Sequence, residues 1–254
     1  MKFRVSFSKE DFYIGEPEYT EYFYEHIFPM ISFSEIPISS IHNHLYRYGD
    51  CIIGIDLNWA IENGCNQVHY CQQASIITES LFTTYHHYND LILGNEVLNT
   101  PLYEERKRSF EHLEYQMAFT KNYKGKVVSV NYKNDNYIFA EEKEWRFVPF
   151  NDSEDSPLSL EPKKFEENKE EYQNKIRENG LEFGLSDINY LVVETDEQKI
   201  EIRNMIIDLN KDIHINIFTN KEILNRFLGY KNSSIKEYKL NEEIKLLKNN
   251  LVNK

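Results

Sequence analysis

The sequence predicts an α+β protein with a mixed, mostly antiparallel central sheet and flanking helices. Short apolar runs of strand length, such as 51–55, alternate with segments whose apolar residues have helical spacing, such as 102–120. Residues that break regular structure, among them Pro37, Gly49 and Gly64, separate these segments at short intervals. Toward the C-terminus, an order of strand, helix and strand predicts a βαβ-like extension with a parallel strand pair.

The length and composition predict one globule with a tail. The chain has 254 residues, of which 41% are hydrophobic and 28% charged, so a sizeable core is possible. We expect a core domain over 1–150, a βαβ-like part of the same globule over 151–230, and a charged helical tail over 231–254.

Charge and cysteine content exclude several classes of protein. The net charge of −13 makes direct nucleic-acid binding unlikely to be the function, because phosphate contacts require clustered Lys and Arg. No apolar run reaches the roughly 20 residues of a membrane span, and the N-terminus lacks the features of a signal peptide. Three cysteines fit neither a disulfide framework nor a zinc ribbon, so we expect a cytoplasmic protein without a metal.

The first part of the chain is rich in short elements. Pro37 ends a strand because it has no N–H to donate. The run over 51–55 is almost entirely apolar, which predicts a strand buried on both faces. The full expected order is strand 2–7, helix 19–28, strand 30–34, helix 39–46, strand 51–55, helix 57–63 and strand 67–71.

The second part begins with two helices that Gly94 and Pro101 separate. The polar, acidic stretch 151–162 is the best candidate for a loop. The expected elements are helices 73–93 and 102–120, a hairpin of 126–132 and 136–140 around 133–135, strand 142–148, helix 163–178, strand 189–194, helix 196–209, strand 214–218 and helix 220–228.

The run 142–147, EKEWRF, carries the strongest chemical pattern. On a strand, Glu142, Glu144 and Arg146 share one face and Trp145 shares the other with Phe147. We expect the aromatic pair to anchor the core and the charged face to point into a cleft or solvent. A carboxylate accepts hydrogen bonds from ribose hydroxyls, and a guanidinium binds phosphate. The alternative is a cross-strand ion pair on a wet sheet face, which contributes little.

Polar residues near the front of the chain are candidate partners of that charged face. Ser32 and Ser34 share one strand face and are either ligand contacts or ordinary strand serines, since no nucleophile elbow surrounds them. His42 and His44 are two positions apart on a predicted helix and diverge, so a shared metal is disfavoured. One of them can face the cleft together with Tyr48 or Tyr46.

Taken together, these motifs resemble the AbiGi-type abortive phage-resistance family over roughly 28–150. The family typically shows an F-C/S-D/E-I-P-L-S motif, a helix with a His, a Y-G pair, a W-A-x-x-x-G-x-N-P-V-x-Y segment and an E-x-E-W-R strand. The corresponding residues here are Phe33 to Ser39, His44, Tyr48, Gly49, Trp59, Ala60, Gly64, Asn66, Tyr70, Glu142, Glu144, Trp145 and Arg146.

The resemblance implies antiphage defence by arrest of the host. The family is described as the antitoxin-like half of a two-gene system whose other half is a nucleotidyltransferase-like toxin. Its layout is also similar to the ADP-ribosyltransferases of the DarT-like kind, which implies NAD if the protein is active. By that similarity Glu144 is the catalytic residue that stabilises oxocarbenium charge. The expected ligand-binding residues are Arg146, His44, Tyr48, Ser32, Ser34 and Glu142.

One departure from the family pattern keeps a second function open. Family members usually begin with a strand carrying an F-H-F/Y-T-like motif, whereas this chain starts at MKFRVSF. The resemblance therefore allows an ADP-ribosyltransferase-like protein, toxic or catalytically decayed. It also allows a non-enzymatic antitoxin or sensor whose partner is a toxin, a phage protein or a second copy, and the missing N-terminal motif favours this interpretation over an active transferase. A truncated gene or mis-set start would also explain the departure, and a metal-dependent nuclease fits least.

Overall fold

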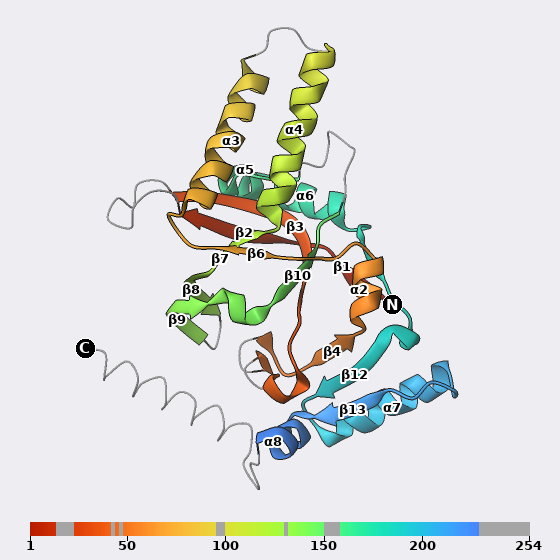
Figure 1. Ribbon diagram of the computed structural model, residues 1–254. Helices are drawn as coiled ribbons and strands as arrows, with labels where there is room; N and C mark the ends of the chain where they lie inside the picture. The colour runs from red at the N-terminus through yellow and green to blue at the C-terminus, as the bar shows by residue number, and fades with distance from the viewer. Residues whose placement is uncertain are drawn as a thin grey trace, which may run out of the picture. The chain divides into compact units, whose positions relative to one another are not determined.

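The computed structural model describes residues 1–13, 23–41, 44–45, 48–94, 100–129, 132–149 and 158–228 (Figure 1). The chain forms two compact units. Unit 1 consists of Met1–Glu35, Ile61–Val127 and Asn134–Glu182, and unit 2 of Ile36–Ala60, Val128–Lys133 and Phe183–Lys254. The expected division near residue 150 follows chain order, whereas the two units interleave segments of the chain. The expected tail over 231–254 lies outside the described residues.

Unit 1 contains an antiparallel sheet, which confirms the α+β class. Its strands are β2 (Ser6–Tyr13), β3 (Phe23–Ser34), β10 (Glu144–Phe147) and β5 (Asn66–Gln67), in the order β2-β3-β10-β5. Every pair in this sheet is antiparallel. Strand β3 therefore pairs along one edge with β2 and, at its C-terminal end, along the other edge with β10.

The long strand β3 corrects the helix expected over 19–28. Pro29 lies inside this strand and has no N–H for a ladder hydrogen bond. On the same strand edge, the N–H of Ile27 donates to the carbonyl of Leu160, and pairing with β10 begins only at Ile31. Pro29 falls between these two contacts, so its missing donor interrupts neither. The strand can accommodate a proline because its partner changes at that position.

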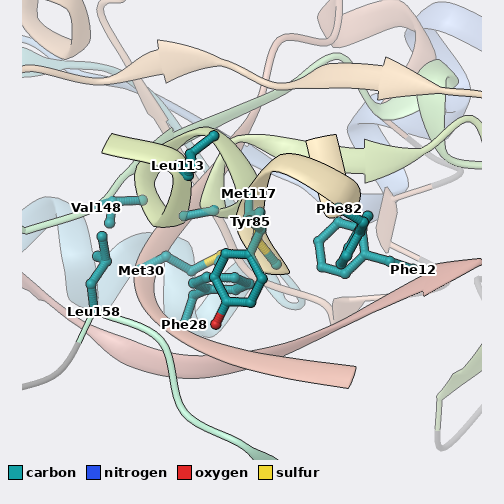
Figure 2. Close-up of a cluster of buried hydrophobic side chains, with 10 residues drawn as sticks. Phe12, Phe28, Met30, Phe82, Tyr85, Leu113, Met117, Val148 and Leu158 are labelled. Carbon is teal, nitrogen blue, oxygen red and sulfur yellow. The ribbon is translucent and has the colours of Figure 1, made fainter. Parts of the chain in front are cut away.

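Helices cover both faces of this sheet. One face packs against α3 (Ile76–Leu93) and α4 (Pro101–Ala118), which lie side by side in Figure 1. Ser75 and Thr100 cap these helices, each accepting a hydrogen bond from an N–H of the first turn. The buried core on this face, drawn in Figure 2, consists of Phe12, Phe28, Met30, Phe82, Tyr85, Leu113, Met117, Ala118, Val148 and Leu158.

The opposite face packs against α5 (Pro162–Glu167) and α6 (Lys169–Ile176). These two helices replace the single helix expected over 163–178. Ile27, Leu160, Phe165 and Tyr172 form the buried cluster here, with Phe7 packed against it. A strand that is covered on both faces needs buried side chains on both, which explains why polar residues on β2 and β10 also become buried.

Among the described residues, three smaller strand pairs have all or most of their residues in unit 1. Strand β1 (Lys2–Arg4) pairs antiparallel with β11 (Gly180–Glu182). Strand β6 (His69–Cys71) pairs parallel with β7 (Thr120–Asn122), which follows α4 directly. Strands β8 (Lys124–Ser129) and β9 (Tyr132–Ile138) also pair, and the turn expected at 133–135 lies within β9.

Unit 2 contains a three-stranded sheet in the order β13-β12-β4. The parallel pair of β12 (Ile188–Val193) and β13 (Asn216–Thr219) is joined by α7 (Asp196–Leu209), as the βαβ-like pattern predicted. Strand β4 (Ile52–Ile55) joins β12 antiparallel. Ile53 of β4 is exposed, so the prediction of a strand buried on both faces was wrong.

Two layers flank this sheet. On one face, buried residues of 38–45 and of α8 (Asn220–Leu228) pack on Val192. On the other face, α7 packs on Val193 and on Ile217. The remaining short elements are η1 (Ile38–Ser40), α2 (Leu57–Glu62), η2 (Phe139–Glu142) and η3 (Leu185–Asp187). Among the described helices, none has both the length and the apolar character to cross a membrane.

Candidate functional site

A cluster of five charged residues lies in unit 1, on the sheet face that α3 and α4 cover; four of them are buried and Lys121 is partly buried. It contains Glu10 of β2, Lys121 of β7, Glu142 of η2, and Glu144 and Arg146 of β10. We call these five residues the buried charge cluster. The Arg146 side chain is 0% exposed, and the three carboxylates are buried as well. Charges in such surroundings are stable only when they are paired and hydrogen-bonded.

Arg146 is the centre of this cluster. Its Nε donates to Oε1 of Glu144 at 2.7 Å, and one terminal nitrogen donates to Glu10. The other terminal nitrogen donates to the carbonyl oxygen of Ala118, the last residue of α4. The last carbonyls of a helix have no partner within the helix and carry its negative dipole end. The guanidinium therefore joins β10, β2 and the end of α4 in one set of bonds.

Lys121 provides the second positive charge. Its Nζ lies 2.7 Å from Oε2 of Glu144 and 3.4 Å from Oε2 of Glu142. The ammonium also lies 4.7 Å from the ring centroid of Phe139, a cation–π geometry. Opposite Lys121 on β6 is Tyr70, whose hydroxyl accepts a hydrogen bond from the Glu144 N–H at 2.8 Å. Both carboxylate oxygens of Glu144 thus contact a cation.

The backbone turns sharply between the two acidic residues. Lys143 has φ of 44°, the left-handed conformation that ordinary residues seldom adopt. It ends η2 and precedes β10, so the strand expected from residue 142 begins at 144 instead. Glu142 therefore belongs to the 3-10 turn and not to the strand. The turn still brings both carboxylates to Lys121.

The opposing charges set the pKa values in the cluster. Burial alone would raise the pKa of Glu144, but Arg146 and Lys121 outweigh it and lower that pKa to about 2. Burial would lower the pKa of Lys121, yet the surrounding carboxylates raise it. For Glu10, burial outweighs the attraction of Arg146, and its pKa is raised. Glu144 is consequently ionised at every physiological pH.

The two faces of β10 are reversed relative to the sequence prediction. Glu144 and Arg146 do share a face, but that face is buried and not exposed to solvent. Trp145 and Phe147 are only partly buried. The indole N–H of Trp145 donates to Oε2 of Glu35 at 2.9 Å. The reversal occurs because the end of α4 and Lys121 supply partners that make burial of the charged face possible.

The predicted serines lie beside this face on the neighbouring strand. Ser34 pairs in register with Glu144, and Ser32 with Arg146. Directly opposed residues of an antiparallel pair project from the same face. Both serines are exposed, unlike their partners on β10. Their role as ligand contacts stays a prediction.

The other two predicted binding residues belong to unit 2. The rings of His44 and Tyr48 stack with centroids 5.4 Å apart and an interplanar angle of 26°. The Tyr48 side chain is exposed, whereas His44 is partly buried. His42, the alternative to His44, lies outside the described residues. A ligand role for His44 and Tyr48 stays a prediction.

Sequence reasoning missed Glu10, Lys121 and Tyr70. Glu10 lies two residues before Phe12 on the same, buried face of β2. A charged residue on the apolar face of a strand indicates that it has a buried partner. Lys121 directly follows the end of a predicted helix and carries no comparable signal. Among the described residues, no group of three or more His, Cys, Asp or Glu is arranged to hold a metal ion. In this cluster, the carboxylates are paired with Lys121 and Arg146.

Comparison with known proteins places this arrangement in a family. A family model described as "Putative abortive phage resistance protein AbiGi, antitoxin" matches residues 4–194. The chain belongs to the AbiGi family. The abortive phage resistance protein AbiGi of Lactococcus lactis subsp. cremoris is 27% identical over 185 residues, which are 66% of this chain and 72% of that protein. No solved structure matches.

The AbiGi match confirms the resemblance and extends it in both directions beyond 28–150. It contains the whole buried charge cluster, from Glu10 to Arg146. It ends at residue 194, directly before the N-cap of α7. The family description names an antitoxin. The ADP-ribosyltransferase-like layout stays a prediction.

Proposed function

We propose that this AbiGi-family protein is the non-enzymatic antitoxin of an abortive-infection pair, which binds a toxin protein and keeps it inactive. The family description supports this function. The single structural observation that carries it concerns Glu144, the carboxylate expected to perform chemistry. Its two oxygens accept from Arg146 and Lys121, and its side chain is buried.

A carboxylate that acts on a ribose must contact the sugar in the transition state. Glu144 could do so only by giving up bonds to two cations in a buried setting. Breaking such a pair leaves an uncompensated buried charge, which costs about 3 to 5 kcal/mol. The observed contacts favour a structural role, in which the cluster joins β2, β7, β10 and α4 into one scaffold. The function then resides on the surface of that scaffold.

The acidic character of the chain suits a basic protein partner. With a net charge of −13, the molecule attracts a positively charged surface and accelerates the encounter with it. A toxin that acts on nucleotides or nucleic acid carries such a surface, because it must contact phosphates. An acidic antitoxin can cover that surface and so block the toxin. The expected partner is therefore a toxin with a basic surface.

The test is growth of cells that produce the protein encoded by the neighbouring gene, the candidate toxin. We expect arrest with the toxin alone and normal growth when this chain is co-produced. The chain produced alone should be harmless, and the Glu144→Gln variant should protect like the wild type. Incubation of the purified chain with NAD and cell extract should leave proteins free of ADP-ribose by mass spectrometry. Growth arrest by this chain alone that depends on Glu144 would refute the proposal.

The transferase alternative has two observations in its favour. Glu144 is ionised at all physiological pH values, and the exposed Ser32 and Ser34 lie opposite the charged residues of β10. A fixed carboxylate of this kind can stabilise oxocarbenium charge, with NAD as the substrate. The alternative requires the buried charge cluster to open. The NAD experiment above decides between the two functions.

A further inference from the structure

Helix α7 of unit 2 exposes an unusual amount of apolar surface. Four of its large hydrophobic side chains are between 43% and 70% exposed: Ile200, Met205, Ile207 and Leu209. The helix needs none of them for packing, because Ile202 and Ile206 already contact the sheet cluster of Val193 and Ile217. Large apolar side chains gathered on one exposed element are typical of an interaction surface.

The exposed residues form an ordered surface. Successive helix residues are about 100° apart, so Ile200 and Ile207 lie on one flank of α7 and Met205 and Leu209 on the other. Between the flanks, on the side opposite the sheet, lies an acidic ridge of three exposed residues, Glu197, Glu201 and Asp208. We call these seven residues the α7 surface. It offers apolar contacts on both sides of a row of carboxylates.

The helix that carries this surface is held firmly in place. Thr195 and Gln198 form a reciprocal capping box at its N-terminus. The Nζ of Lys199 binds both carboxylate oxygens of Glu222 in α8, at 2.6 and 2.7 Å. A partner that meets a preorganised face loses less conformational entropy on binding.

The position of α7 in the chain bears on what it recognises. The family match ends at residue 194, one residue before the N-cap Thr195. The buried charge cluster thus lies within the part described by the family model, and the α7 surface lies outside it. A surface that selects one partner among the toxins of related systems is expected to differ from system to system.

We propose that the α7 surface binds the toxin partner, through a toxin surface whose Lys or Arg residues are flanked by apolar side chains. This inference rests on the proposed antitoxin function and deepens it. The apolar flanks would desolvate the contact, and the acidic ridge would pair with the basic residues. A second copy of this chain is a poorer occupant. A two-fold interface through α7 would bring the acidic ridge of one copy against that of the other.

The test measures binding of the purified product of the neighbouring gene to the full chain by calorimetry. One variant combines Ile200→Ser and Ile207→Ser, and a second combines Glu201→Lys and Asp208→Lys. Each should weaken binding at least about tenfold, as expected at the centre of an interface. The charge-reversed variant should also show a weaker salt dependence of binding than the wild type.

Matched controls lie in unit 1. Ile76→Ser with Ile77→Ser removes apolar residues that are as exposed as those of α7, and Glu167→Lys with Glu178→Lys reverses exposed charges. Both controls should bind the toxin like the wild type. Wild-type affinity in both α7 variants would overturn the inference while leaving the antitoxin function intact. Absence of binding by the wild-type chain would overturn both.

Light scattering of the chain alone measures its molar mass and so tests whether the α7 surface binds a second copy. We expect the wild type and both α7 variants to have the same molar mass. A wild-type dimer that the α7 substitutions convert to a monomer, with unchanged toxin binding, would assign the surface to a second copy and overturn the inference.

Discussion

Glu144 and Arg146, two positions apart on β10, bind each other side by side in the interior of unit 1. The Nε of Arg146 lies 2.7 Å from Oε1 of Glu144, and no part of the guanidinium side chain reaches solvent. The same guanidinium also binds Glu10 and the terminal carbonyl of α4. Because Glu144 also contacts Lys121 of β7, the charges of one strand join three other elements.

The first prediction concerns the loss of Arg146. Arg146→Met should lower the free energy of unfolding by about 3 to 5 kcal/mol, because Glu10 and Glu144 lose their buried counter-charge. Urea unfolding measures the change. Adding Glu10→Gln and Glu144→Gln to the same chain should restore part of the loss, since the uncompensated charges are then removed. A loss below about 0.5 kcal/mol for Arg146→Met, the level of ordinary surface changes, would contradict the structural role of the cluster.

The second prediction compares neighbours on β10. Glu144→Ala should destabilise the protein more than Trp145→Ala does, because Glu144 is buried between two cations and Trp145 is partly exposed. We expect about 3 kcal/mol or more for Glu144→Ala and about 1 to 2 kcal/mol for Trp145→Ala. Thermal unfolding of both variants under one condition gives the order. A larger loss of stability for Trp145→Ala than for Glu144→Ala would instead indicate that the aromatic face of β10 is the one packed in the core.

The reversed burial of the two faces of β10 shows what local sequence patterns can and cannot predict. The alternation of EKEWRF placed Glu144 and Arg146 on one face, and the structure has them in contact. Which face is buried depended on Glu10, 136 residues before Arg146, and on Lys121, 23 residues before Glu144. No periodicity within the strand carries that information. The βαβ-like order around α7 was predictable because its pattern is local and its caps are explicit.

Strand β3 illustrates the second limit. Its first half falls within the helix that was expected over 19–28. Pro29 is instead tolerated inside the strand, because its edge partner changes there from Leu160 to β10. The partner change arises from chain segments more than a hundred residues away, so tertiary context here overrides local propensity.

The third prediction concerns stability in acid. The pKa of Glu144 is lowered from 4.5 to about 2 in the folded protein. Its contribution is therefore fully present above pH 4.5 and is lost as the pH falls toward 2. The free energy of unfolding of Glu144→Gln should depend less on pH in this window than that of the wild type. Glu62→Gln, at an exposed position, should retain the wild-type dependence.

The fourth prediction concerns His26, which is buried beneath α3. Burial, assisted by His86, lowers its pKa from 6.5 to about 4. Between pH 6.5 and pH 4, His26 is protonated in the unfolded chain but remains neutral in the folded protein. The free energy of unfolding therefore falls as the pH drops from 6.5 to 4. His26→Gln can keep the hydrogen bond with Ser159 and should flatten this part of the curve. Titration of His26 by NMR near pH 6.5 would contradict the assignment.

The most direct test of the account is protection of cells by the Glu144→Gln variant against the toxin encoded by the neighbouring gene. The assay is performed at a temperature where circular dichroism shows the variant to be folded. If Glu144 supports a scaffold whose surface binds the toxin, the folded variant protects as well as the wild type. A folded variant that binds the toxin but no longer protects would show that the carboxylate acts in chemistry, and the account would be wrong.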